Sequence, residues 1–148
     1  MKSFKVVLVR ANSVFRDFLP LENSQVEHCE GAKENLADDA AMSSALKIKT
    51  LVGQLTKDDL LLTLISGGGS SLLACPTPPI TVEELRQLTA LMSRNGATIH
   101  QLNTVRKQVE QLKGGKLAKL ASPSTVSYFE TVHTHVYFRL NGCYVYVL

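Results

Sequence analysis

The stretch D-D-L-L-L-T-L-I-S-G-G-G-S-S, from Asp58 to Ser71, decides the fold of this 148-residue chain. Its uncharged run from Leu60 to Ile65 suits a strand that is buried on both faces, as in a parallel sheet. The glycines that follow allow positive φ angles and leave backbone N–H groups open, with hydroxyl side chains on either side. Ligands of open α/β sheets bind beyond the carboxyl ends of the strands, where this loop should lie. The stretch therefore predicts a buried parallel strand followed by a loop that binds anions, above all phosphates.

The segments before this strand predict an α/β fold, with a Rossmann-like parallel sheet and flanking helices. Short strands are expected at residues 5–10 and 25–29. A helix capped by Asp38 or Asp39 should run to about Leu55. Strand, helix and strand in this order predict a right-handed parallel crossover.

Two further helices are expected after the prolines that follow the glycine loop. Thr81 and Glu84 form a capping-box pattern for the first helix, which should end at Asn95-Gly96. Thr98 can cap the second helix, which should end at Gly114-Gly115. The buried face of the second helix is expected to carry Ile99, Leu102, Val105 and Val109.

From Ser127 onward the pattern changes to that of a β-hairpin. The segments V-H-T-H-V-Y-F-R-L and C-Y-V-Y-V-L flank Asn141-Gly142, which favours a type I′ turn. We therefore expect two parts, a partial domain at residues 1–126 and a tail at residues 127–148 that forms a hairpin.

Composition limits the class of protein. The chain is 45% apolar and 20% charged, and a net charge of +3 is too small to argue for a nucleic-acid partner. No apolar run approaches the roughly 18 residues that span a bilayer, so no membrane partner is expected. The three widely spaced cysteines indicate a reducing compartment, the cytoplasm, with the mitochondrion left open. His133 and His135 have no carboxylate or thiol at ligand spacing, so no metal site is predicted.

The first group of candidate binding residues is the glycine loop itself. It is formed by Ser66, Gly67, Gly68, Gly69 and Ser70. The loop matches neither G-x-G-x-x-G nor the P-loop pattern, and a purely structural turn is the other interpretation. Its position after a buried strand favours phosphate binding.

The second group comes from the helix expected after Thr98. Asn103, Arg106 and Lys107 occupy positions i, i+3 and i+4, so they share one helix face. Arg106 can hold a carboxylate or phosphate with two hydrogen bonds, whereas Lys107 acts as a point charge. An ordinary solvated helix face is the alternative. Lys113, before two glycines, fits either an anion site or an ordinary helix end.

With these residues in place, the chain resembles the N-terminal domain of type 2 glycerate kinases over about residues 22–126. Four segments carry the resemblance: E-G-A-K-E-N-L at 30–36, L-T-K-D-D-L-L-L-T-L-I-S-G-G-G-S-S-L-L at 55–73, G-A-T-I-H-Q-L-N-T-V-R-K at 96–107 and Q-L-K-G-G-K-L-A at 111–118. The resemblance implies ATP- and Mg²⁺-dependent phosphorylation of D-glycerate, in a cleft between a Rossmann-like domain and a second α/β domain. It implies that this cleft is lined by the residues that match the family's motifs: Ser66, Gly67, Gly68, Gly69, Ser70, Asn103, Arg106, Lys107 and Lys113.

The chain also departs from the family pattern. We expect this chain to lack a counterpart of the glycine-flanked lysine that precedes this region in the family, and to lack the second domain. The segment after Lys113-Gly114-Gly115 is expected to differ from that of the family. The expectation is a truncated form with little kinase activity. The alternative is a non-catalytic fragment that binds phosphate or nucleotide, or that associates with itself or another protein through exposed sheet edges.

Overall fold

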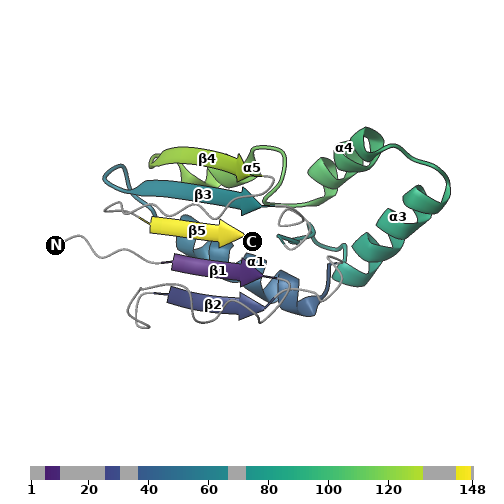
Figure 1. The fold of residues 1–148 in the computed structure, drawn as a ribbon, viewed down its shortest axis with the longest axis horizontal. Coiled ribbons are helices and arrows are strands. Elements are labelled where there is room, and N and C mark those ends of the chain that lie inside the picture. The colour runs from purple at the N-terminus through teal and green to yellow at the C-terminus, as the bar shows by residue number, and fades with distance from the viewer. Residues whose placement is uncertain (1–5, 11–25, 31–36, 67–72, 132–142, 148) are drawn as a thin grey trace.

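Five parallel strands form a single sheet in the computed structural model, which describes residues 6–10, 26–30, 37–66, 73–131 and 143–147. The strand order is β2-β1-β5-β3-β4, and every neighbouring pair is parallel (Figure 1). The strands are β1 (Val6–Arg10), β2 (Val26–Glu30), β3 (Leu60–Ser66), β4 (Thr125–Thr131) and β5 (Cys143–Val147). The predicted α/β fold with a parallel sheet is confirmed.

The predicted central strand is β3, and it lies between β4 and β5. Leu61 pairs with Val126 on one side and with Cys143 on the other, so both hydrogen-bonding edges are used. The side chains of Leu61 and Thr63 are fully buried. Leu61 belongs to the core cluster with Ile48 and Leu117, and Thr63, two residues further on, lies on the same face of the strand, so the described burial is that of this one face.

The predicted C-terminal β-hairpin is wrong. Cys143–Val147 forms β5 in the middle of the sheet, parallel to β1 on one side and to β3 on the other. A strand has two hydrogen-bonding edges, and both edges of β5 are taken, so none remains for an antiparallel arm. The expected first arm and the Asn141-Gly142 turn lie outside the described residues. The expected boundary after residue 126 falls inside β4, and strands from both sides of it share the sheet.

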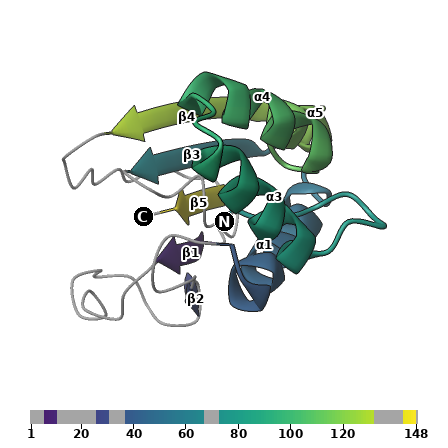
Figure 2. The ribbon, with the colours of Figure 1, turned by 90° about the vertical axis from the view of Figure 1, so that its right-hand side faces the viewer.

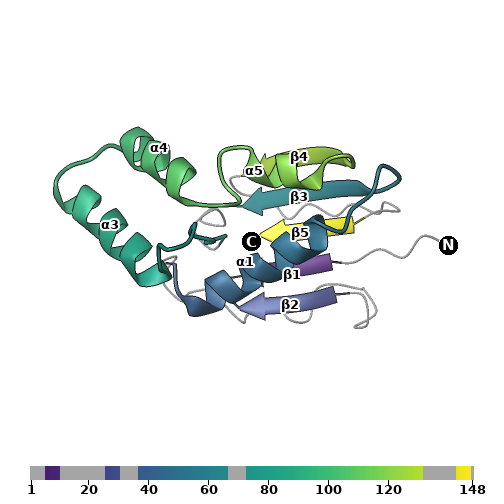
Figure 3. The same cartoon turned by 180° about the vertical axis from the view of Figure 1, so that it is seen from behind.

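Helices α1 (Asp39–Val52) and α5 (Lys116–Ala121) lie side by side on one face of the sheet (Figure 3). Asp38 caps α1 by accepting a hydrogen bond from the backbone N–H of Ala41 at 2.7 Å. The buried stripe of α1 is Ala41, Ser44, Ala45, Ile48 and Val52. Each large aliphatic side chain buried here contributes about 1.5–3 kcal/mol. The predicted helix packed on the sheet is confirmed, with Asp38 rather than Asp39 as its cap, and it ends at Val52 rather than at about Leu55.

Helices α3 (Val82–Arg94) and α4 (Ile99–Val109) project beyond the carboxyl ends of the strands, and Figure 2 shows them in front of the sheet. Both begin with a complete capping box, from Thr81 and Thr98. Helix α3 ends at Asn95-Gly96 as predicted, with Gly96 at a φ of 74°.

Helix α4 ends earlier than predicted, at Val109 rather than at Gly114-Gly115. Glu110 has φ −115° and ψ 147°, which is extended backbone, and it forms an antiparallel bridge with Pro76. The predicted buried face of α4 is also only partly right. Leu102 is buried, but Ile99 is 71% exposed.

Candidate functional site

The glycine loop begins at the carboxyl end of β3, on the side of the sheet toward α3 and α4 (Figure 1). Ser66 is the last residue of β3. The structure does not describe Gly67, Gly68, Gly69 and Ser70, so these candidate residues remain a prediction. The description resumes at Leu73, in a buried segment that runs to Pro76. The site is therefore built from what surrounds this exit segment.

The exit segment of the loop pairs with the chain that leaves α4. Gln111 donates its backbone N–H to the carbonyl of Cys75 at 2.7 Å, and Thr77 donates to the carbonyl of Val109 at 2.8 Å. Because this pairing needs extended backbone, it ends α4 at Val109. It also brings the residues around position 110 beside the exit of the glycine loop.

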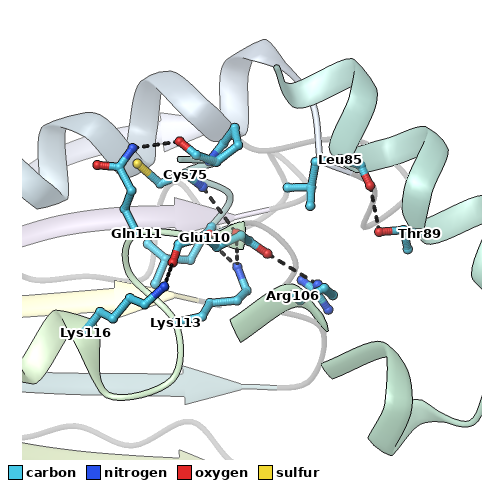
Figure 4. A network of polar contacts seen from close by, with 10 residues as sticks. Cys75, Leu85, Thr89, Arg106, Glu110, Gln111, Lys113 and Lys116 are labelled. Atoms are coloured by element: carbon cyan, nitrogen blue, oxygen red, sulfur yellow. Dashed lines mark hydrogen bonds and ion pairs between the residues drawn. The ribbon is translucent and has the colours of Figure 1, made fainter. Parts of the chain in front are cut away.

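A carboxylate lies at the centre of this junction (Figure 4). The Glu110 side chain is only 1% exposed. Its Oε2 accepts a hydrogen bond from Lys113 Nζ at 2.7 Å and one from the Cys75 backbone N–H at 3.3 Å. Its Oε1 lies 3.4 Å from Arg106 Nε. Burying an unpaired carboxylate is strongly unfavourable, so these partners are what permit a charged group here. We call Arg106, Glu110 and Lys113 the Glu110 cluster.

Lys113 ties this cluster to the glycine loop. Its side chain is 13% exposed, and its ammonium donates to the carbonyl of Leu73 as well as to Glu110. Burial lowers the pKa of Lys113 from its ordinary value, and the Glu110 carboxylate opposes this effect only in part. Two of the three ammonium donors are thus used inside the protein, one of them on the exit of the loop.

Arg106 is held much more loosely than Lys113. Its side chain is 15% exposed, and the 3.4 Å contact with Glu110 is an ion pair too long for a good hydrogen bond. Glu110 Oε1 accepts no hydrogen bond from any described residue. Within the described part of the chain, no hydrogen bond is donated by the Arg106 guanidinium, which carries five N–H groups. This is the buried polar group of the site with spare capacity for a ligand.

Further cations surround the same junction. Lys116 Nζ donates to the backbone carbonyls of Glu110 at 2.6 Å and Gln108 at 3.1 Å. Lys49, from α1, donates to the side-chain oxygen of Gln111 at 2.5 Å, and the amide of Gln111 donates to the Pro76 carbonyl at 2.7 Å. These lysines and the Glu110 cluster place four positive charges around one described carboxylate. The excess of positive charge favours anions.

The structure brings Arg106 and Lys113 together, as the anion hypothesis requires, but it does so through a residue that the sequence analysis missed. Glu110 falls in the last turn of the helix expected to end at Gly114-Gly115, where a glutamate usually faces solvent. A carboxylate with an arginine four residues before it and a lysine three residues after it was the available signal. Asn103 is half-buried on α4, and Lys107 is exposed. Lys107 packs its aliphatic stem against Gly114, where an added Cβ would lie 3.1 Å from Lys107 Cβ.

Two negative findings apply to the described residues only. They contain no group of three or more His, Cys, Asp or Glu side chains that could hold a metal ion. None of their helices combines the length and apolar character needed to cross a lipid bilayer.

Comparison with known proteins then identifies the family. Residues 3–130 match the family model described as "Domain of unknown function (DUF4147)". The chain belongs to the DUF4147 family. Relatives of this DUF4147 chain include human glycerate kinase, 49% identical over 125 residues, which are 84% of this chain and 24% of the human protein. A protein of Agrobacterium vitis, provisionally named hydroxypyruvate reductase, is 42% identical over 95 residues, or 64% of this chain and 25% of that protein.

The fold of this DUF4147 chain also has a solved counterpart. The crystal structure of a glycerate kinase from Thermotoga maritima superimposes with a TM-score of 0.74 and 26% identity, covering 88% of this chain and 36% of that one. The resemblance to the type 2 glycerate kinase family is therefore confirmed. This chain spans about a quarter of the length of the human relative.

Proposed function

We propose that this chain provides the glycine-loop part of an ATP-dependent glycerate kinase. The observation that carries the proposal is the tie from Leu73 through Lys113 and Glu110 to Arg106, which keeps a cation beside the exit of the glycine loop. Phosphoryl transfer depends on positioning the phosphates and on offsetting their charge. Both substrates, ATP and D-glycerate, carry oxyanions that an arginine can hold with two parallel hydrogen bonds.

Within this proposal the candidate residues have different tasks. Backbone N–H groups of Gly67, Gly68 and Gly69, with the hydroxyls of Ser66 and Ser70, would cradle a phosphate. Arg106 supplies a positive charge with free donors, and Lys113 fixes the segment that leaves the loop. Asn103 and Lys107 remain secondary candidates for contact with substrate, because both lie on α4 with Arg106.

The kinase chemistry implied by the family uses Mg²⁺ together with ATP. No group of three His, Cys, Asp or Glu side chains that could hold a metal ion is present among the described residues. The buried carboxylate nearest the loop, Glu110, is engaged by Lys113 and Arg106. Mg²⁺ in ATP-dependent enzymes usually binds through the substrate phosphates with one or two carboxylates and water, so in this proposal the phosphates of ATP would be its main ligands.

Little turnover is expected from the purified chain, because it spans about a quarter of its human relative and the resemblance implies a reaction cleft between two domains. The test is release of ADP by the purified chain with Mg-ATP and D-glycerate, alongside calorimetric titration of ATP. ATP binding with turnover far below about 1 per second supports the proposal, since kinases typically reach 1–100 per second. Oxidation of NADH with hydroxypyruvate, without ATP binding, would instead favour the activity named for the Agrobacterium relative.

The proposal extends to location and association. Cys29 and Cys75 are free and buried, which supports a reducing compartment, and we place the chain in the cytoplasm, with the mitochondrion as the alternative. The outer strands of the sheet, β2 and β4, are the expected surfaces for self-association. Sedimentation velocity at several concentrations measures that association directly.

A further inference from the structure

The two cations of the Glu110 cluster are not equivalent. Lys113 makes two hydrogen bonds, one to the Leu73 carbonyl and one to Glu110 Oε2. Arg106 makes only a 3.4 Å ion-pair contact through Nε. The sequence motifs place both residues in the same candidate site and do not separate their roles. The contacts do separate them.

Lys113 is poorly suited to bind substrate. Its ammonium could turn toward a ligand only by releasing the Leu73 carbonyl or the Glu110 carboxylate. Either change would leave a polar group unpaired in a site where the Lys113 side chain is 13% exposed and the Glu110 side chain 1% exposed. Lys113 therefore acts as a tether, holding the exit of the glycine loop to the end of α4.

Arg106 has the opposite character. The contact with Glu110 runs through Nε, so the two terminal amino groups of the guanidinium lie outside that pair. These groups form the edge that grips a phosphate or carboxylate with two parallel hydrogen bonds. Glu110 approaches from the other edge, and its unsatisfied Oε1 can shorten its contact with Nε when the arginine becomes ordered.

We infer that Glu110 is a positioning residue with two functions. Its carboxylate fixes Lys113 on the Leu73 carbonyl, which sets the exit of the glycine loop, and it orients Arg106, whose terminal amino groups bind an oxyanion of the substrate. This inference rests on the proposed function for the identity of that substrate, ATP or D-glycerate. The oxyanion site itself follows from the contacts of the Glu110 cluster.

The experiment measures binding of three probes to the full chain by calorimetry: pyrophosphate, ATP and D-glycerate. The variants are Arg106→Gln, Glu110→Gln and the double variant, with Arg94→Gln as a control that removes an exposed arginine from the end of α3. Circular dichroism selects a temperature at which every variant is folded. Arg106→Gln should weaken pyrophosphate binding by about tenfold or more, whereas Arg94→Gln should stay within about twofold.

Glu110→Gln gives the most informative result. Removing a negative charge beside an anion site strengthens binding if only net charge matters, whereas loss of positioning weakens it. We expect weaker binding by about tenfold, and a much smaller loss when the Arg106→Gln background already lacks the arginine, because only the function through Lys113 then remains to be lost. A merely structural role would instead give losses that add fully in the double variant. Tighter or unchanged binding in Glu110→Gln, or additive losses, overturns the inference.

The three probes also separate this inference from the proposed function. Arg106-dependent binding of pyrophosphate, without binding of ATP or D-glycerate, supports the inference and rejects the kinase assignment. ATP binding that is equal in the wild type and in Arg106→Gln rejects the inference and leaves the kinase assignment in place. If no probe binds to the wild-type chain, both are rejected. If Arg106→Gln weakens binding of D-glycerate only, Arg106 holds the carboxylate of glycerate. If it weakens binding of ATP only, Arg106 holds the phosphates of ATP.

Discussion

Replacing Lys113 with methionine tests the electrostatic arrangement of the Glu110 cluster. Methionine keeps much of the buried aliphatic volume but removes the ammonium, and with it the hydrogen bonds to Leu73 and Glu110. Glu110 then remains buried with only the Cys75 N–H and the looser Arg106 contact. We expect the Lys113→Met variant to fold but to be markedly less stable than the wild type.

The size of the effect follows from the burial of the stranded carboxylate, whose side chain is 1% exposed. Breaking a buried ion pair by removing one partner costs about 3–5 kcal/mol. Because the Cys75 N–H and Arg106 still contact the carboxylate, we expect a loss toward the lower end of this range, about 3–4 kcal/mol at pH 7.

The double variant Glu110→Gln/Lys113→Met gives the matching control. Burial lowers the pKa of Lys113 despite the neighbouring carboxylate, so desolvation outweighs the attraction within the pair. The double variant should therefore recover most of the stability that Lys113→Met loses, because replacing both partners of a buried ion pair with uncharged residues is often close to neutral. Because the folded-state pKa of Lys113 is lowered, its contribution to wild-type stability should rise as the pH increases toward about 10.5, and Lys113→Met should lack this rise.

The assay is equilibrium unfolding in urea at pH 7 and at alkaline pH, followed by circular dichroism, with Lys107→Met as an exposed control. The control should change the free energy of unfolding by less than about 0.5 kcal/mol. A Lys113→Met cost below about 1 kcal/mol at pH 7 would refute the reasoning, since it would mean that the Glu110 carboxylate is not confined as described.

Three further predictions concern stability. Glu84 accepts hydrogen bonds from the N–H and hydroxyl of Thr81, and these bonds lower the pKa of its carboxyl group. Its contribution to stability should therefore be complete above about pH 4.5 and should disappear as the pH falls through the lowered pKa. Glu84→Gln should remove this part of the acid transition in thermal melts. Gly114→Ala should lower the free energy of unfolding by about 1–2 kcal/mol because of its φ of +64°, and further because the new Cβ would clash with Lys107. Gly96→Ala is the matched control, since Gly96 also has a positive φ but no atom close to an added Cβ. Equal urea midpoints for the two variants would contradict the close approach of Lys107 to Gly114. Leu61→Ala, at a fully buried position of β3, should cost about 2–5 kcal/mol in the same unfolding assay, and a cost below 1 kcal/mol would argue against a central strand.

Local patterns predicted the elements whose determinants lie close together in the sequence. The uncharged run from Leu60 to Ile65 became β3, and Asp38 and the Thr81–Glu84 pair became helix caps. The stop at Asn95-Gly96 was also correct. Caps and turns depend on hydrogen bonds among residues three or four positions apart, so a few residue types suffice to specify them.

The end of α4 shows where such reasoning stops. The apolar periodicity continues to Leu112, and two glycines follow, so a helix ending at Gly114 satisfies every local rule. The chain instead becomes extended at Glu110, because the segment after the glycine loop offers it an antiparallel partner at Pro76. That partner is far away in the sequence, and so is the environment that makes Glu110 a buried carboxylate.

The same limit explains the tail. The β-branched and aromatic residues at 143–147 correctly indicated a strand, but this composition reports the conformation of one strand and not the identity of its neighbours. The sequence alone therefore determined the family and most of the helix and strand starts, because these depend on short motifs, and it predicts the glycine loop. Tertiary structure decided that β5 lies between β1 and β3 and that Glu110 joins Arg106 to Lys113. The position of β5 depends on pairing between strands that are far apart in the sequence. The ion pairs of Glu110 are local, but its burial depends on the distant segment at Cys75 and Pro76, which makes the chain extended at Glu110.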